Sequence, residues 1–161
     1  MAEIQGLATS KDLVVLNFAA KNKEQVIREL GQRVLKKGHI EEEFIERVLK
    51  REEEFPTGLA FEVNIAIPHI GEHCNNSFLS FATLKEPVLF SPMDGSEEDL
   101  NVEIVFLFGI TNPEAQVEVL KKFIFAFREG DALVKLKGYT EAAEALNYLN
   151  TILGNALEIM D

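Results

Sequence analysis

The sequence contains a single cysteine, Cys74, among its 161 residues. One thiol cannot form a disulfide within the chain, so we expect a cytoplasmic protein. No apolar run approaches the roughly 18 residues that a bilayer-spanning helix needs. The first residues, MAEIQGLATSKD, lack the basic and apolar segments of a signal peptide. We therefore expect neither export nor direct insertion into a membrane.

Positive charge is also scarce. The 16 Lys and Arg residues stand against 27 Asp and Glu residues, which gives a formal net charge of -11. Nucleic acids and anionic lipids attract cationic surfaces, so this balance argues against both as partners. It is compatible with a basic protein partner, and equally with a simple role in solubility. The length and the apolar share of 47% are typical of one soluble domain, which we expect to span residues 1–161.

The pattern of apolar residues and breakers predicts strands and helices in an order that does not alternate regularly. Asn22 and Gly38 bound the first helix, and Asn112-Pro113 begins the third element from the end. The order β-α-α-β-β-β-α-α-α predicts an α+β fold, an α/β/α sandwich whose mixed sheet of four or five strands has helices on both faces. The expected strands are 12–19, 64–68, 77–84 and 102–110, and the expected helices are 23–37, 41–54, one from residue 112 with the stripe Val117, Leu120, Ile124 and Phe127, 130–137 and 141–153.

Three histidines are the most chemically versatile side chains of the sequence. His39 follows Gly38 between two helices and is expected to be a solvent-exposed loop residue. His69 ends the apolar strand NIAIP, directly after Pro68. A rigid strand end can present a side chain at the edge of a sheet, so we expect His69 in a shallow depression there. A neutral imidazole in such a place can act as a nucleophile, for example toward a phosphoryl group.

Two other kinds of site are open from the residues alone. His69, His73 and Cys74 could contribute to a zinc site, although their number and spacing do not fit the usual zinc motifs. Cys74 and a histidine could form a hydrolase pair, but no local signature of such enzymes surrounds the cysteine. If neither site exists, we expect Cys74 to be a small, partly buried residue. Arg51 could hold a phosphoryl group with its guanidinium fork, or it could be an ordinary member of the charged run KREEE.

The stretch REEEFPTGLAFEVNIAIPHI, residues 51–70, resembles the signature of the type-2 enzyme IIA family of the phosphoenolpyruvate-dependent sugar phosphotransferase system. The shared features are an arginine-glutamate run, a Phe-Pro-Thr-Gly turn and an Ala-Ile-Pro-His strand end, and the likeness extends over about residues 10–155. It implies the phosphotransferase/anion-transport-protein-like fold. It also implies a phosphotransferase component that needs no metal or cofactor.

The resemblance also assigns roles to residues and names partners. His69 takes the position of the phosphorylated histidine, with Nε2 as the attacking atom and Nδ1–H held by a backbone carbonyl, and Arg51 lies near it. The phosphocarrier protein HPr donates the phosphoryl group. His69 then passes it to an enzyme IIB, which phosphorylates the sugar that enters through the membrane subunit IIC. A binding module in which His69 only anchors a small anion is the alternative of another class.

One position departs from many members of the family. Fructose- and mannitol-type members often have a second histidine early in the helix that begins at Asn112-Pro113, where this chain has Gln116. Glutamine there resembles the galactitol branch, and so does a second histidine soon after the first, to which His73 would correspond. Gln116 can donate or accept a hydrogen bond at the site but carries no charge. Galactitol uptake is the expected function. The alternatives are a fructose- or mannitol-type IIA and a regulatory, nitrogen-related domain.

Overall fold

The structure, a computed structural model, describes residues 6–128 and 130–160. Residues 1–5, part of the segment for which we expect no signal peptide, lie outside the described residues. Within the part that is described, no helix has the length and apolar character that crossing a bilayer requires. The strands and helices follow one another as β1 (Leu7–Ser10), the 3₁₀ turn η1 (Lys11–Leu13), β2 (Val14–Phe18), α1 (Lys23–Lys36), α2 (Glu43–Glu54), β3 (Gly58–Leu59), β4 (Ile65–Ala66), β5 (His69–Ile70), β6 (Phe78–Phe90), β7 (Leu100–Gly109), α3 (Pro113–Arg128), α4 (Ala132–Lys137), α5 (Ala142–Ile152) and β8 (Leu157–Met160).

A mixed sheet lies at the centre of the molecule, in the order β3-β4-β7-β6-β1-β8. The two long strands β6 and β7 pair antiparallel, while β4 and β5 run parallel to β7 one after the other. In the same way, β1 and β2 run parallel to β6. Two short strands thus follow one another along the outer edge of each long strand: β4 and β5 along β7, and β1 and β2 along β6. The expected mixed sheet is confirmed, but within residues 6–128 and 130–160 it has eight strands rather than four or five.

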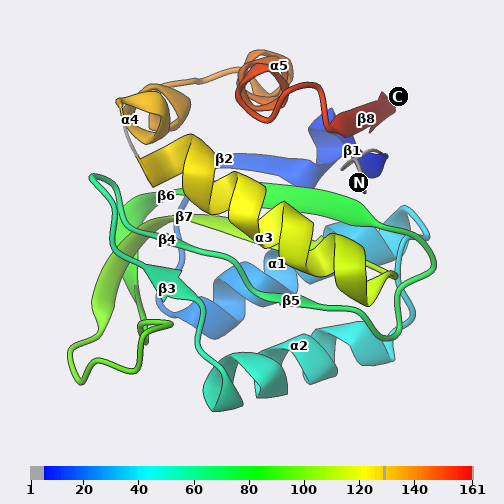
Figure 1. Cartoon of the computed structure of the whole chain (residues 1–161), viewed down its shortest axis with the longest axis horizontal. Coiled ribbons are helices and arrows are strands. Elements are labelled where there is room, and N and C mark those ends of the chain that lie inside the picture. The colour runs from blue at the N-terminus through cyan, green and yellow to red at the C-terminus, as the bar shows by residue number, and fades with distance from the viewer. Residues whose placement is uncertain (1–5, 129, 161) are drawn as a thin grey trace.

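Helices cover both faces of this sheet (Figure 1). Side chains along β7 alternate between the two faces: Ile104, Phe106 and Phe108 belong to the core beneath α3, α4 and α5, whereas Val105 and Leu107 belong to the core beneath α1 and α2. All five are fully buried, as the nearly continuous apolar run of this strand requires. The α/β/α sandwich is thus confirmed, and β7 lies at its centre.

The helix that follows β7 is turned differently from our expectation. Val117 was expected on its apolar stripe, but 51% of this side chain is exposed. Phe127 is buried as expected, but the buried face also carries Val119 and Phe123, so that its residues recur every four positions. Phe123 and Phe127 pack against Phe106, and Phe123 also packs against Phe108. The first helix is predicted well: it begins after Asn22, whose side chain accepts a hydrogen bond from the Gln25 N–H.

The strand expected over residues 64–68 is interrupted. Ile65–Ala66 and His69–Ile70 each pair with β7, and Ile67 and Pro68 between them lie outside both strands. Pro68 has no N–H to offer to a ladder, which accounts for the break. The Pro68 carbonyl still accepts a hydrogen bond from the Phe108 N–H at 3.2 Å. His69 therefore begins a new short strand at the far end of β7.

Candidate phosphohistidine site

His69 is held in one orientation from two sides. Its ring stacks on Phe108, its partner in β7, with a centroid distance of 5.3 Å and an interplanar angle of 10°. Its Nδ1 lies 2.6 Å from the carbonyl oxygen of Ile67. A carbonyl oxygen only accepts, so Nδ1 carries the proton, and in the neutral ring the lone pair remains on Nε2. The expected tie between Nδ1–H and a backbone carbonyl is present.

The surroundings keep this imidazole uncharged. Burial lowers the pKa of His69 below its ordinary value of 6.5, the hydrogen bond to Ile67 opposes this change, and the positive charge of Arg51 lowers the pKa further. Only 7% of the residue is exposed, so His69 is more enclosed than the shallow depression that we expected. Stacking on Phe108 and the bond to Ile67 draw the ring against the sheet, which explains the difference. The result is a neutral ring whose Nε2 can act as a nucleophile near pH 7.

Arg51 reaches this region from the last turn of α2. Its guanidinium carbon lies 4.5 Å from the centre of the Phe55 ring, and 59% of Phe55 is exposed. Arg51, Phe55 and Ile70 line a surface hollow together with the cations Arg47 and Lys50 and the carboxylates Glu54 and Glu72. Ile70 directly follows His69, so the hollow borders the histidine. In this hollow the three cations outnumber the two carboxylates, and a guanidinium beside a neutral histidine suits an anionic group such as phosphate.

Gln116 comes to the same end of the sheet from the first turns of α3. A Cβ placed on Gly71 would lie 3.9 Å from the side-chain oxygen of Gln116 and 2.9 Å from the carbonyl oxygen of Ile110. The half-buried amide of Gln116 is therefore packed close to the loop that leaves His69. The fold thus gathers all three of the predicted site residues at the end of β5.

His39 is not the solvent-exposed loop residue that we expected. It is half-buried, its Nδ1 lies 3.0 Å from Asn76 Oδ1, and its ring stacks on Phe78 at 5.9 Å. The loop that carries it is fastened to the segment before β6, because the Asn75 N–H and side-chain amide donate to the carbonyls of His39 and Gly38. These contacts turn the ring inward and give His39 a packing role.

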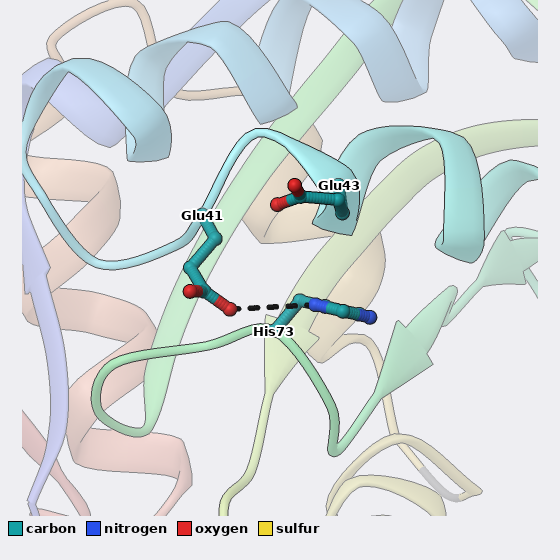
Figure 2. Close-up of side chains that lie close together, drawn as sticks. All are labelled: Glu41, Glu43 and His73. Carbon is teal, nitrogen blue, oxygen red and sulfur yellow. Dashed lines mark hydrogen bonds and ion pairs between the residues drawn. The ribbon is translucent and has the colours of Figure 1, made fainter.

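His73 lies close to two carboxylates at the start of α2, as Figure 2 shows. Its Nδ1 is 3.3 Å from Glu41 Oε1, and the ligand atoms of Glu41, Glu43 and His73 lie within 4.8 Å of one another. Among the described residues, these three are the group of donors that could hold a cation, and the group contains neither His69 nor Cys74. The zinc set of His69, His73 and Cys74 is therefore not brought together.

The Cys74 thiol is placed unfavourably for nucleophilic chemistry. It is half-buried, as expected, and its sulfur lies 3.4 Å from the carbonyl oxygen of Gly71. Burial raises the pKa of this thiol above its ordinary value, which favours the unreactive protonated form. Its sequence neighbour His73 pairs with Glu41 instead. This arrangement gives no support to a cysteine hydrolase.

Sequence reasoning missed two buried polar residues next to the site, Glu52 and Thr57. Only 1% of Glu52 and 3% of Thr57 are exposed. The run REEE suggests four exposed charges, but Glu52 follows Phe44 and Val48 at intervals of four residues and so lies on the buried stripe of α2. That spacing is the signal that could have identified it.

This fold is shared with proteins of known class. The sequence profile of the family "Phosphoenolpyruvate-dependent sugar phosphotransferase system, EIIA 2" matches residues 8–152. The chain therefore belongs to this family of phosphotransferase relay proteins. Within it, the chain is similar to the galactitol-specific EIIA component of Escherichia coli K12, with 27% identity over 117 residues that cover 71% of this chain and 77% of that protein.

Two further relatives show how widely the domain is used. The crystal structure of the mannitol IIA of Escherichia coli superposes with a TM-score of 0.72 at 29% identity, covering 86% of this chain and 96% of that one. The probable licABCH operon regulator of Bacillus subtilis is 28% identical over 143 residues, which are 85% of this chain but 21% of the regulator. The chain thus spans about a fifth of that relative's length.

Proposed function

We propose that His69 is the residue that carries the phosphoryl group, and that HPr supplies it and an enzyme IIB receives it. The observation that carries this proposal is the Nδ1–H bond to the Ile67 carbonyl, which leaves the lone pair on Nε2 of a neutral ring. In the first transfer, the Nε2 lone pair forms a bond to phosphorus as the phosphorus–nitrogen bond to the HPr histidine breaks. In the second, a thiolate of enzyme IIB attacks the same phosphorus, and the His69 nitrogen recovers its electron pair.

Arg51 and Gln116 assist in this proposal. The guanidinium of Arg51 supports the charge of the phosphoryl oxygens, and the amide of Gln116 donates a hydrogen bond to one of them. The exposed ring of Phe55 forms an apolar part of the surface on which the two partners dock in turn. In this proposal the membrane subunit IIC completes sugar uptake, and this chain does not touch the sugar.

The test is phosphorylation in a mixture of phosphoenolpyruvate, enzyme I, HPr and this protein, read by intact mass. The wild type should gain the mass of one phosphoryl group. His69→Ala should gain none, whereas His39→Ala and His73→Ala should behave as the wild type. The product is a phosphoramidate, so it should be lost in acid and kept in base. Normal phosphorylation of His69→Ala would overturn the assignment, and a protein that binds anions without gaining mass would be a binding module.

For the sugar, we propose a galactitol system. Gln116 and the likeness to the galactitol-specific component support it, although the mannitol IIA is similar to a comparable degree. The measurement that decides is the rate of transfer from the phosphorylated protein to galactitol-type and mannitol-type IIB proteins. Faster transfer to the galactitol-type partner is expected. Faster transfer to the mannitol-type partner would reassign the sugar, and transfer to neither would favour a regulatory role.

A further inference from the structure

Glu52 is a carboxylate in an unusual place. It belongs to the same helical turn as Arg51, Glu53 and Glu54, which are exposed, yet its own side chain is enclosed. Burying a carboxylate is costly unless its oxygens are well satisfied. The ion pairs formed within the described part of the chain do not include it. Its burial therefore needs another explanation.

The explanation lies in a continuous path of hydrogen bonds that ends at His69. The Thr57 N–H donates to Glu52 Oε2 at 2.8 Å, and the Thr57 hydroxyl donates to Glu52 Oε1 at 2.7 Å. The oxygen of that hydroxyl accepts the Ile67 N–H at 3.1 Å. The Ile67 carbonyl in turn accepts the Nδ1–H of His69. All of these groups are buried, so water does not compete for them.

Ile67 needs this support because the sheet does not provide it. The residue lies in the gap between β4 and β5, where neither strand includes it. Its N–H is therefore taken by a side chain, Thr57, and its carbonyl is left for the histidine. Without Thr57, the buried N–H of Ile67 would lose its hydrogen-bond partner, and Ile67 could shift together with the imidazole that its carbonyl holds.

We infer that Glu52 and Thr57 are positioning residues for the nucleophile: the carboxylate fixes the Thr57 hydroxyl, the hydroxyl fixes Ile67, and the Ile67 carbonyl fixes the tautomer and orientation of His69. The inference rests on the proposed role of His69. Neither residue touches the phosphoryl group, so they act through the geometry of Ile67 alone. The two oxygens of Glu52 accept both Thr57 bonds, which directs the free lone pair of the hydroxyl toward the Ile67 N–H.

The test uses two variants that keep the shape of the side chains. Thr57→Val removes the hydroxyl, and Glu52→Gln places an amide NH₂ against one of the Thr57 donors. Thr57→Ser restores a hydroxyl and serves as the rescue. Glu53→Gln makes the same chemical change as Glu52→Gln at the exposed neighbouring residue and is the matched control. Thermal unfolding of each variant shows that it is folded at the temperature of the assay.

Two measurements are made on every variant. The first is the fraction of His69 in the Nδ1–H tautomer, read from the ¹⁵N shifts of the ring in the unphosphorylated protein. The second is the rate of phosphorylation by phosphorylated HPr. We expect Thr57→Val and Glu52→Gln to lower the Nδ1–H fraction and to slow phosphorylation by about tenfold or more, as misplacement of a reacting group does. Thr57→Ser and Glu53→Gln should stay within about twofold of the wild type, a change too small for lost positioning.

The outcomes separate this inference from the proposed function. An unphosphorylated wild type would refute the function, while the tautomer measurement would still test the path to His69. A phosphorylated wild type whose Thr57→Val variant is less stable but has an unchanged tautomer and rate would overturn the positioning role. If Glu52→Gln does not fold, Thr57→Val decides by itself.

Discussion

Titration of Glu52 should make the stability of this protein depend on pH in a way that one substitution removes. Burial raises the pKa of Glu52 from 4.5 to about 7, against the opposing effects of its two hydrogen bonds from Thr57 and of the positive charge of Lys23. Glu52→Gln retains the size of the side chain but cannot titrate. The quantity to compare is the free energy of unfolding of the wild type minus that of the variant, measured across a range of pH.

The sign follows from which state holds the proton. Below pH 4.5 the carboxyl is protonated in both the folded and the unfolded chain, and its contribution to stability is fully present. Between pH 4.5 and about 7 only the folded chain keeps the proton, so stability is lost as the pH rises. At about 1.4 kcal/mol for each pH unit, the loss across this window is about 3 kcal/mol. Above it, both states are ionised and no further loss occurs.

Urea unfolding at closely spaced pH values measures this difference. The wild type should lose about 3 kcal/mol relative to Glu52→Gln over the window. The unfavourable NH₂ contact in the variant shifts its stability by a constant amount and leaves the slope intact. Glu53→Gln should follow the wild type. A difference between wild type and Glu52→Gln that stays flat from pH 4.5 to 7 would show that Glu52 is ionised throughout and that its burial does not raise its pKa.

Two other substitutions probe the site and the core. Arg51→Ala should raise the pKa of His69, because the arginine charge lowers it. Arg51→Lys should keep that pKa but slow phosphoryl transfer, because lysine lacks the bidentate fork. An NMR titration of His69 that is identical in the wild type and in Arg51→Ala would contradict the first expectation. Gly109→Ala should destabilise the fold by about 1–3 kcal/mol, because a Cβ there would lie 2.6 Å from the Phe78 ring and no side chain at that position has room. Denaturant unfolding measures the second effect, and an unchanged midpoint would mean that Phe78 can move aside.

Local sequence signals predicted the helices and the long strands well. Asn22 is the cap of α1 as expected, and the apolar run of β7 is central and buried on both faces. The short strands β2 and β4 lie within the predicted strands 12–19 and 64–68, but β1, β3 and β8 were not predicted, because their existence depends on distant partners. Residues Leu7–Ser10 and Leu157–Met160 form strands by pairing with each other at opposite ends of the chain. No local sequence pattern predicts that these two segments pair.

The site shows the same division. The strand-end position of His69 and its proline could be recognised from the sequence, and the carbonyl that holds Nδ1 was expected. The enclosure of the His69 ring was not expected, since it comes from Phe108 on another strand. Glu52 was concealed by the three charged residues around it, although its spacing from Val48 placed it inside. Long-range packing, rather than composition, decided which of these charges is buried.

The parallel pairing of β1 with β8 also bears on how the chain folds. Leu7 lies opposite Leu157, so this contact closes a loop that runs from residue 7 to residue 157, and Figure 1 shows β1 and β8 side by side at one edge of the sheet. Closing such a loop costs entropy before any contact compensates for it. During synthesis, β1 must wait until β8 has been made before its outer edge is covered. The pair of strands β1 and β8 should therefore be among the last parts of the sheet to become stable.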